Sequence, residues 1–145
     1  MTFIHEFTAI REGVTIGKNT IIGAFTVIEE GATIGNNVTF QPHSVISRNA
    51  IIEDNVFIGP HFSCANNSFI PDGEHGLSEN KRPDKEKIMK IGKGTRIGTR
   101  CTVAPGVTIG KDCFIKMNCI IFCDVPDGTT IGKNTVWDVS QRDNF

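Results

Sequence analysis

The sequence predicts an all-β domain built from one short repeat, and three observations support this fold class. An aliphatic or aromatic anchor recurs every sixth position over most of the chain. A small or β-branched residue lies four positions after most anchors, and glycine often follows the anchor directly. No helix has a period of six, whereas stacked short strands produce such repeats. The 145 residues suit one domain with its own core, so we expect a single unit over 1–145.

The anchors give the expected elements in chain order. A first register of hexads runs unbroken from residue 4 to residue 64, a second runs from 91 to 121, and a third follows after a slip. The anchors are Ile4, Ile10, Ile16, Ile22, Ile28, Ile34, Phe40, Ile46, Ile52, Ile58, Cys64, Ile91, Ile97, Val103, Ile109, Ile115, Ile121, Val125, Ile131 and Trp137. We expect each anchor to fill the core from a short strand.

The interruption between the first two registers predicts a long loop over about residues 70–90. It contains "PDGEHGLSENKRPDKEK", which is too polar and charged for a buried coil. Long loops that leave a regular scaffold often carry function. At the other end, residues 137–145 are expected to form a short tail.

This repeat resembles that of the hexapeptide-repeat proteins. The resemblance implies a left-handed parallel β-helix of about six triangular coils, with three hexads in each coil of about 18 residues. Each strand then pairs with the strand one coil further along. Glycine is expected after the anchors because the backbone bends there.

Positions about 18 apart stack in such a helix, so the residue three after each anchor forms a column along a corner. Two columns hold Gly, Asn and Asp, which predicts tight left-handed turns. The third column runs Phe7, Phe25, His43, His61, and we expect it to follow a different rule. Bulky aromatic side chains at a corner favour contact with another subunit, and we expect a homotrimer. If the register resumes on the next face after the loop, Arg100 and Asn118 continue this column.

The segments "FQPHSVISRNAIIEDNVFIGPHFSCANN", "IGKGTRIGTRCTVAPGVTIGKDCFI" and "DVP" resemble the sugar acetyltransferases of this family. The resemblance implies transfer of an acetyl group from acetyl-CoA to the amine or hydroxyl of a sugar. The sugar is expected to be nucleotide-linked, in surface polysaccharide biosynthesis. The reaction needs a base, donors for the oxyanion and close positioning of two substrates.

The resemblance also implies that Gln41 and Asn66 line the acceptor site. The residue His75, within the predicted loop, is expected to contact the acceptor as well. His61 is the first candidate for the base, with His43 beside it, although a hydrogen-bonded corner pair remains open for these two histidines.

Acetyl-CoA is expected along the coils after the loop, with Ala104, Lys116 and Lys133 as cofactor-binding residues. Relatives carry a run of small residues where this chain has Lys116, Met117 and Asn118. The two lysines are therefore candidates for the CoA phosphates.

Composition excludes several other functions. A formal net charge of −1 argues against a nucleic-acid surface, and no apolar run approaches the roughly 20 residues needed to cross a membrane. The start "MTFIHEFTAI" lacks the pattern of a signal peptide, so we expect a cytoplasmic protein. The five cysteines lack zinc-ligand spacing, and we expect Cys101, Cys113 and Cys119 to fill inward slots.

Two alternatives stay open. The first is a non-catalytic β-helix scaffold or binding subunit that has lost the CoA groove, which Lys116 and Met117 favour. The second is a zinc enzyme like the gamma-class carbonic anhydrases, for which His43, His61 and His75 supply three imidazoles. Their spacing does not match the ligand pattern of that class, and we expect no metal site.

Overall fold

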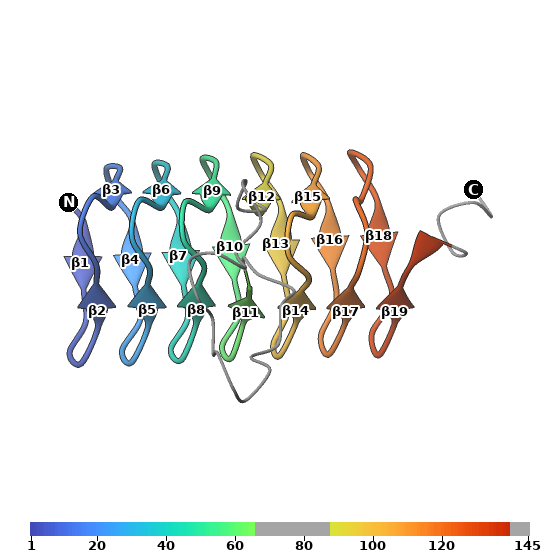
Figure 1. The fold of residues 1–145 in the computed structure, drawn as a ribbon, viewed down its shortest axis with the longest axis horizontal. Helices are drawn as coiled ribbons and strands as arrows, with labels where there is room; N and C mark the ends of the chain where they lie inside the picture. Colours follow the sequence, from blue (N-terminus) through green and yellow to red (C-terminus); the bar gives the residue numbers. More distant parts are fainter. Residues whose placement is uncertain (66–87, 140–145) are drawn as a thin grey trace, which may run out of the picture.

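The chain winds as a parallel β-helix of triangular cross-section (Figure 1). The computed structural model describes residues 1–65 and 88–139. The winding matches the left-handed β-helix of about six coils that the repeat predicts, and each strand spans only two residues. The predicted loop lies almost wholly outside the described residues, and β12 already begins at Lys90.

Three parallel sheets form the three faces of the prism. Sheet I holds β1 (Phe3–Ile4), β4 (Ile21–Ile22), β7 (Thr39–Phe40), β10 (Phe57–Ile58), β13 (Arg96–Ile97), β16 (Phe114–Ile115) and β18 (Thr130–Ile131). Sheet II holds β2 (Ala9–Ile10), β5 (Val27–Ile28), β8 (Val45–Ile46), β11 (Ser63–Cys64), β14 (Thr102–Val103), β17 (Ile120–Ile121) and β19 (Val136–Trp137). Sheet III holds β3 (Thr15–Ile16), β6 (Thr33–Ile34), β9 (Ile51–Ile52), β12 (Lys90–Ile91) and β15 (Thr108–Ile109).

Backbone hydrogen bonds join each coil to the next. Phe3 pairs with Ile21, one coil further along. Across the loop the pairing keeps its register, with Phe57 opposite Arg96. In the last coils the repeat shortens, because Phe114 pairs with Thr130 and Val125 bridges to Ile109. The slip in the anchor pattern therefore removes residues without breaking the stack.

The anchors form the core, as the repeat predicts. The second residue of each strand points inward, and Ile22, Ile58 and Ile97 are buried. Cysteines 101, 113 and 119 are also buried in the small inward slots. The two ends differ, because the first anchor, Ile4, is 53% exposed while Trp137 is 3% exposed. Since β19 ends at Trp137, the tail begins one residue later than predicted.

The glycines after the anchors are needed for a reason other than the one expected. Their φ angles are not left-handed, so the bend itself does not demand glycine. Instead the next coil passes so close that a side chain has no room. A Cβ atom at Gly98 would lie 2.7 Å from the backbone nitrogen of Met117, and one at Gly59 would lie 2.9 Å from Gly98.

All three corner columns adopt the same left-handed backbone, which corrects the expectation that the third column differs. Phe7, Phe25, His43 and His61 have φ between 60° and 65°, and Asn19 at another corner has a φ of 55°. The described corners make this turn whichever side chain they carry, except the shortened corner between Ile121 and Val125, which holds no residue with a positive φ. Arg100 and Asn118 continue the third column with φ of 59° and 60°, as predicted.

Replacing Gly98 with alanine is expected to lower the free energy of unfolding by about 1–3 kcal/mol, because the added methyl group overpacks the backbone of Met117. Gly132→Ala is a matched control in the same turn position, since the nearest atom to its added Cβ is 3.9 Å away. Chemical denaturation of both variants measures the difference. Equal stabilities would contradict the close-approach explanation.

Replacing Arg100 with asparagine is expected to raise the free energy of unfolding by about 1 kcal/mol. A left-handed φ costs most residues about 1–2 kcal/mol, and asparagine tolerates it better. Within the part of the chain that the structure describes, the side chain of Arg100 has no hydrogen-bond or ion-pair partner whose loss would offset this gain. Thermal and urea unfolding provide the test, and a less stable variant would contradict it.

Candidate functional site

The most unusual feature of the surface is a ladder of stacked rings along the edge between sheets I and II. Phe7, Phe25, His43 and His61 follow one another coil by coil. Their ring centroids are 5.0, 5.0 and 4.9 Å apart, and the last two pairs are parallel within 4°. The spacing equals the distance between neighbouring strands, so the ladder follows directly from coil stacking.

The two histidines are stacked and do not form the hydrogen-bonded pair that the sequence left open. Parallel rings with centroids 4.9 Å apart cannot direct an N–H of one ring at a nitrogen of the other. Backbone bonds hold them, because the amide of His43 donates to Ala24 at 3.0 Å and that of His61 donates to Pro42 at 3.2 Å. Both side chains are exposed, so their ring nitrogens can exchange protons with a substrate.

A hollow of about 320 Å³ lies beside this edge in the coils before the loop, and Gln41 is one of its lining residues. Its lining residues are His5, Glu6, Ile21, Gly23, Ala24, Phe40, Gln41 and Pro42. Gln41 precedes His43 by two residues and lies at the same edge of the prism, and its role with the acceptor stays a prediction.

A second hollow, of about 290 Å³, lies along the same edge in the coils after the loop. It is lined by Gly98, Thr99, Phe114, Lys116, Met117 and Lys133. Both lysines predicted to meet the cofactor therefore face one cavity. Its surface is mainly apolar and two lysines line it, which suits a ligand with apolar and anionic parts.

Ala104 lies at a different edge, between sheets II and III. It is half-buried, its backbone nitrogen donates to Ile121 at 2.9 Å, and it packs against the core. One strand of sheet II, roughly 10–13 Å of chain, separates the two edges. Within one chain, Ala104 is therefore not brought to the lysines.

Asn66 and His75 lie outside the described residues, so their predicted contacts with the acceptor stay predictions. The chain leaves the described coils after Ala65, at the edge between sheets II and III. His61 lies at the other end of β11.

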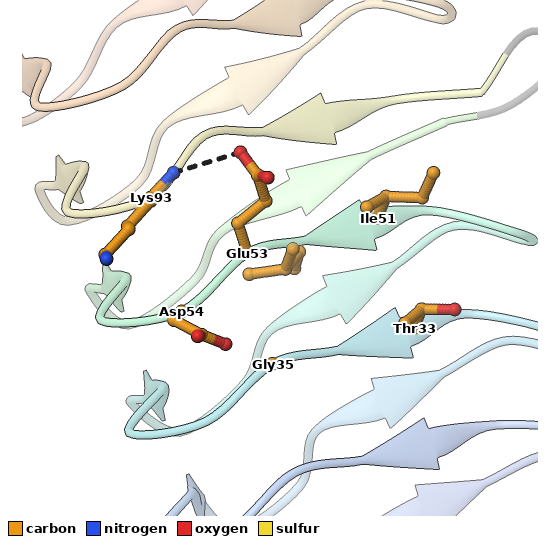
Figure 2. A pocket seen from close by; sticks show the side chains of 7 residues that line it. Thr33, Gly35, Ile51, Glu53, Asp54 and Lys93 are labelled. Atoms are coloured by element: carbon orange, nitrogen blue, oxygen red, sulfur yellow. Dashed lines mark hydrogen bonds between the residues drawn. The ribbon is translucent and has the colours of Figure 1, made fainter.

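Figure 2 shows a third hollow, on sheet III, where the carboxylates already have structural partners. Glu53 accepts a hydrogen bond from the backbone nitrogen of Lys93 at 3.2 Å. Asp54 accepts one from the backbone nitrogen of Asn36 at 2.8 Å and lies against Gly35. These bonds tie neighbouring coils together, which accounts for both acidic groups without a ligand.

The buried cysteines are not suited to nucleophilic catalysis. Burial raises the pKa of the Cys101 thiol from 9.0 to about 11. Burial also raises the pKa of Cys64, against the opposing effect of its hydrogen bonds with Ser47. Both thiols therefore keep their protons at neutral pH, and the thiolate is the nucleophilic form.

Within residues 1–65 and 88–139, no three His, Cys, Asp or Glu side chains gather so that they could hold a metal ion. His75, the third imidazole of the zinc alternative, lies outside these ranges. In the same described part of the chain, no helix is both long and apolar enough to cross a bilayer.

The sequence reasoning missed Arg96 and Phe114. Both occupy the outward position of a sheet I strand and face each other in register. The guanidinium carbon of Arg96 lies 4.8 Å from the centre of the Phe114 ring, and the ammonium of Lys116 lies 5.8 Å from it. In the sequence, each of them directly precedes an anchor, and the two anchors are one coil apart. This spacing could have predicted that the two side chains lie next to each other.

The comparison with protein families identifies the family to which the repeat belongs. The family described as "Bacterial transferase hexapeptide (six repeats)" matches residues 1–30, 31–61 and 89–123. The chain belongs to the bacterial transferase hexapeptide family. No curated protein matches it.

Solved structures of several acetyltransferases share the fold. The acetyltransferase domain of PglB from Neisseria gonorrhoeae, bound to acetyl coenzyme A, is 21% identical over 89% of this chain and 53% of its own, with a TM-score of 0.72. A histidine variant of perosamine N-acetyltransferase from Caulobacter crescentus, in complex with CoA and GDP-perosamine, is 20% identical over 89% and 51%, also with a TM-score of 0.72. This hexapeptide chain spans about half the length of both.

A third structure is a hexapeptide-repeat acetyltransferase from Vibrio cholerae complexed with acetyl coenzyme A. It is 25% identical over 83% of this chain and 66% of its own, with a TM-score of 0.66.

The native cysteines are expected to react slowly with a thiol reagent at pH 8, apart from the half-buried Cys123. The folded state holds the Cys101 proton to a higher pH than the unfolded state does. The resulting stability is therefore present below pH 9 and is lost as the pH rises towards about 11. Labelling followed by mass spectrometry, with and without urea, gives the reactivities. Rapid labelling of native Cys101 would contradict the burial argument.

Proposed function

We propose that this protein is a CoA-dependent sugar acetyltransferase that uses the edge between sheets I and II as its active site. The acceptor is the amine or hydroxyl of a nucleotide-linked sugar. The observation that carries the proposal is the shared edge, since the His43–His61 stack, the Gln41 hollow and the lysine-flanked hollow all follow it. Family membership and the CoA-bound relatives support the same conclusion.

The chemistry assigned to this edge is acyl transfer. The acceptor nitrogen or oxygen attacks the thioester carbonyl carbon, and the tetrahedral intermediate then collapses with cleavage of the carbon–sulfur bond. His61 takes the proton from the attacking group, and the departing sulfur leaves as the CoA thiolate, which is protonated to the thiol. The stacked His43 holds the His61 ring against the edge, and positioning of both substrates supplies much of the rate.

A homotrimer completes the proposed site. Sheet II lies between the histidine edge and the edge at which Ala65 ends the first described range. A neighbouring subunit that covers the histidine edge supplies the second half, including the predicted contacts of Asn66 and His75. The 76% exposed Phe7 and the 50% exposed Phe25 support this contact, because such apolar rings favour a covered interface.

The scaffold is the second candidate, because Lys116 and Met117 project from the edge where relatives carry small residues. Acetyl-CoA binding separates the two functions. Calorimetric titration of the full chain is expected to give a dissociation constant in the micromolar range. No heat and an unchanged melting temperature would overturn the acetyltransferase proposal and leave the scaffold.

His61→Asn is expected to lower kcat about 100-fold or more with a nucleotide amino sugar as acceptor, because a positioned base contributes roughly that much. Asparagine already occupies many of the left-handed corners, so the variant keeps the fold. His43→Asn is expected to show a smaller loss. Release of the CoA thiol, followed with a thiol reagent, measures the rates.

Asn55→Gly, at another corner of the coil that carries His61, is the matched control and should keep wild-type activity. Wild-type kcat in His61→Asn would mean that the leaving thiolate takes the proton and that His61 is not the base. Light scattering of each variant checks that the assembly is retained.

A further inference from the structure

The two ends of the prism, at opposite ends of its long axis in Figure 1, differ in how the core is closed. At the C-terminal end Trp137 is buried, and its indole Nε1 donates to the backbone oxygen of Asp124 at 3.2 Å. At the N-terminal end, formed by β1, β2 and β3, Ile4 is exposed and Ile10 and Ile16 are only half-buried. Solenoids need a cap on each terminal repeat, and the described residues supply none at this end.

The backbone of the N-terminal end is open as well. β1, β2 and β3 are the terminal strands of sheets I, II and III, and within the part of the chain that the structure describes each pairs on one side only. The amides of Phe3 and His5 donate to the second coil at 2.9 Å, so the N–H and C=O of Ile4 between them point off the end. Such an edge offers hydrogen-bonding groups to a further strand.

The charged residues around this end are distributed unequally over its three corners. Glu6 lies at the edge between sheets I and II, and Lys18 lies at the edge between sheets III and I. Arg11 and Glu12 lie together at the edge between sheets II and III. All four are exposed. With His5 neutral beside Glu6, one corner is acidic, one is balanced and one is basic.

A second copy of the chain matches this charge pattern in one arrangement. Two identical triangular ends can meet about a two-fold axis that passes through one edge and the middle of the opposite sheet, which gives three choices. The axis through the edge of sheets I and II brings two Glu6 carboxylates together, and the axis through the edge of sheets III and I brings two Lys18 ammonium groups together. The third axis places Glu6 against Lys18 and Arg11 against Glu12, so every corner meets opposite charge.

We propose that two copies of this protein associate through their N-terminal ends, about the two-fold axis that passes through the middle of sheet I and the edge between sheets II and III. The terminal strands then meet antiparallel, with β1 against its own copy and β2 against β3. Ile4 lies near the axis, where its N–H and C=O pair with the same groups of the second copy. The contact covers Ile4, Ile10 and Ile16, and so caps both cores.

The homotrimer makes this contact large enough to be stable. Each side of the end holds about six residues, or roughly 20 Å at about 3.3 Å per residue, so one end with its side chains presents on the order of 300 Å². Stable interfaces bury about 800 Å² per partner, which the three ends of a trimer provide together and a single end does not. The expected particle therefore has six chains, and this step rests on the homotrimer of the proposed function.

Sedimentation analysis of the full chain at micromolar concentration tests the contact. The wild type is expected to contain six chains, and Ile4→Lys, which places a charge in the apolar centre, is expected to contain three. Glu6→Lys or Lys18→Glu alone should weaken the association of trimers about tenfold or more at low salt, because each brings like charges together. The double variant should restore it, because opposite charges meet again in exchanged positions.

Lys111→Glu is the matched control, since Lys111 is exposed at the same edge as Lys18 but lies several coils from the end, and it should leave the six-chain particle intact. Melting temperatures check that each variant folds. Three chains in the wild type at every concentration, or a double variant that associates no better than the single ones, would overturn the proposal. Open-ended polymers would also overturn it, because they indicate that the N-terminal end binds the C-terminal end.

The same measurements separate this contact from the proposed function. Two chains in the wild type and one in Ile4→Lys would support the end-to-end contact and reject the homotrimer. Three chains in both proteins would support the homotrimer and reject the end-to-end contact.

Discussion

The whole structure depends on one constraint, the stacking of each coil on the next through backbone hydrogen bonds and buried anchors. No strand in residues 1–65 and 88–139 is longer than two residues, so none of these strands is stable alone. Burial of the anchors along the axis supplies the stability, and the paired backbone fixes the register. The glycines, the cysteines in small slots and the carboxylates of Glu53 and Asp54 all serve this stacking. They are structural even where their chemistry looks functional.

The same constraint explains why function can collect on one edge. All but one of the described corners have a left-handed backbone, and most of them use the residues that tolerate it. The edge of sheets I and II instead places rings and a guanidinium there, at a cost of about 1–2 kcal/mol per residue. Stacking offsets part of that cost for the rings. A costly conformation retained over successive coils is expected where a surface is used, and both hollows flank this edge.

The sequence predicted the fold well because its period of six reports directly which side chains point inward. The column of Phe7 to His61, and its continuation to Arg100, followed from spacing alone. The sequence reasoning was wrong about the third corner, because side-chain preference is a poor guide to a backbone turn that coil geometry imposes. Arg96 and Phe114 were missed because only the inward positions and the corners were compared between coils, although the residue before each anchor also stacks from coil to coil. The pattern also cannot tell stacked histidines from hydrogen-bonded ones, since that depends on ring orientation.

The uniform step between coils makes the prism a molecular ruler. Adjacent coils are about 4.8 Å apart, so Gln41 and Lys116, three coils from each other, mark points about 14 Å apart along one edge. This separation can change only by whole coils, because partial insertions either leave the stack as loops or disturb the register. Family members with one coil more or fewer between these two points would therefore accept substrates of different length. Substrate reach in this fold would evolve in discrete increments.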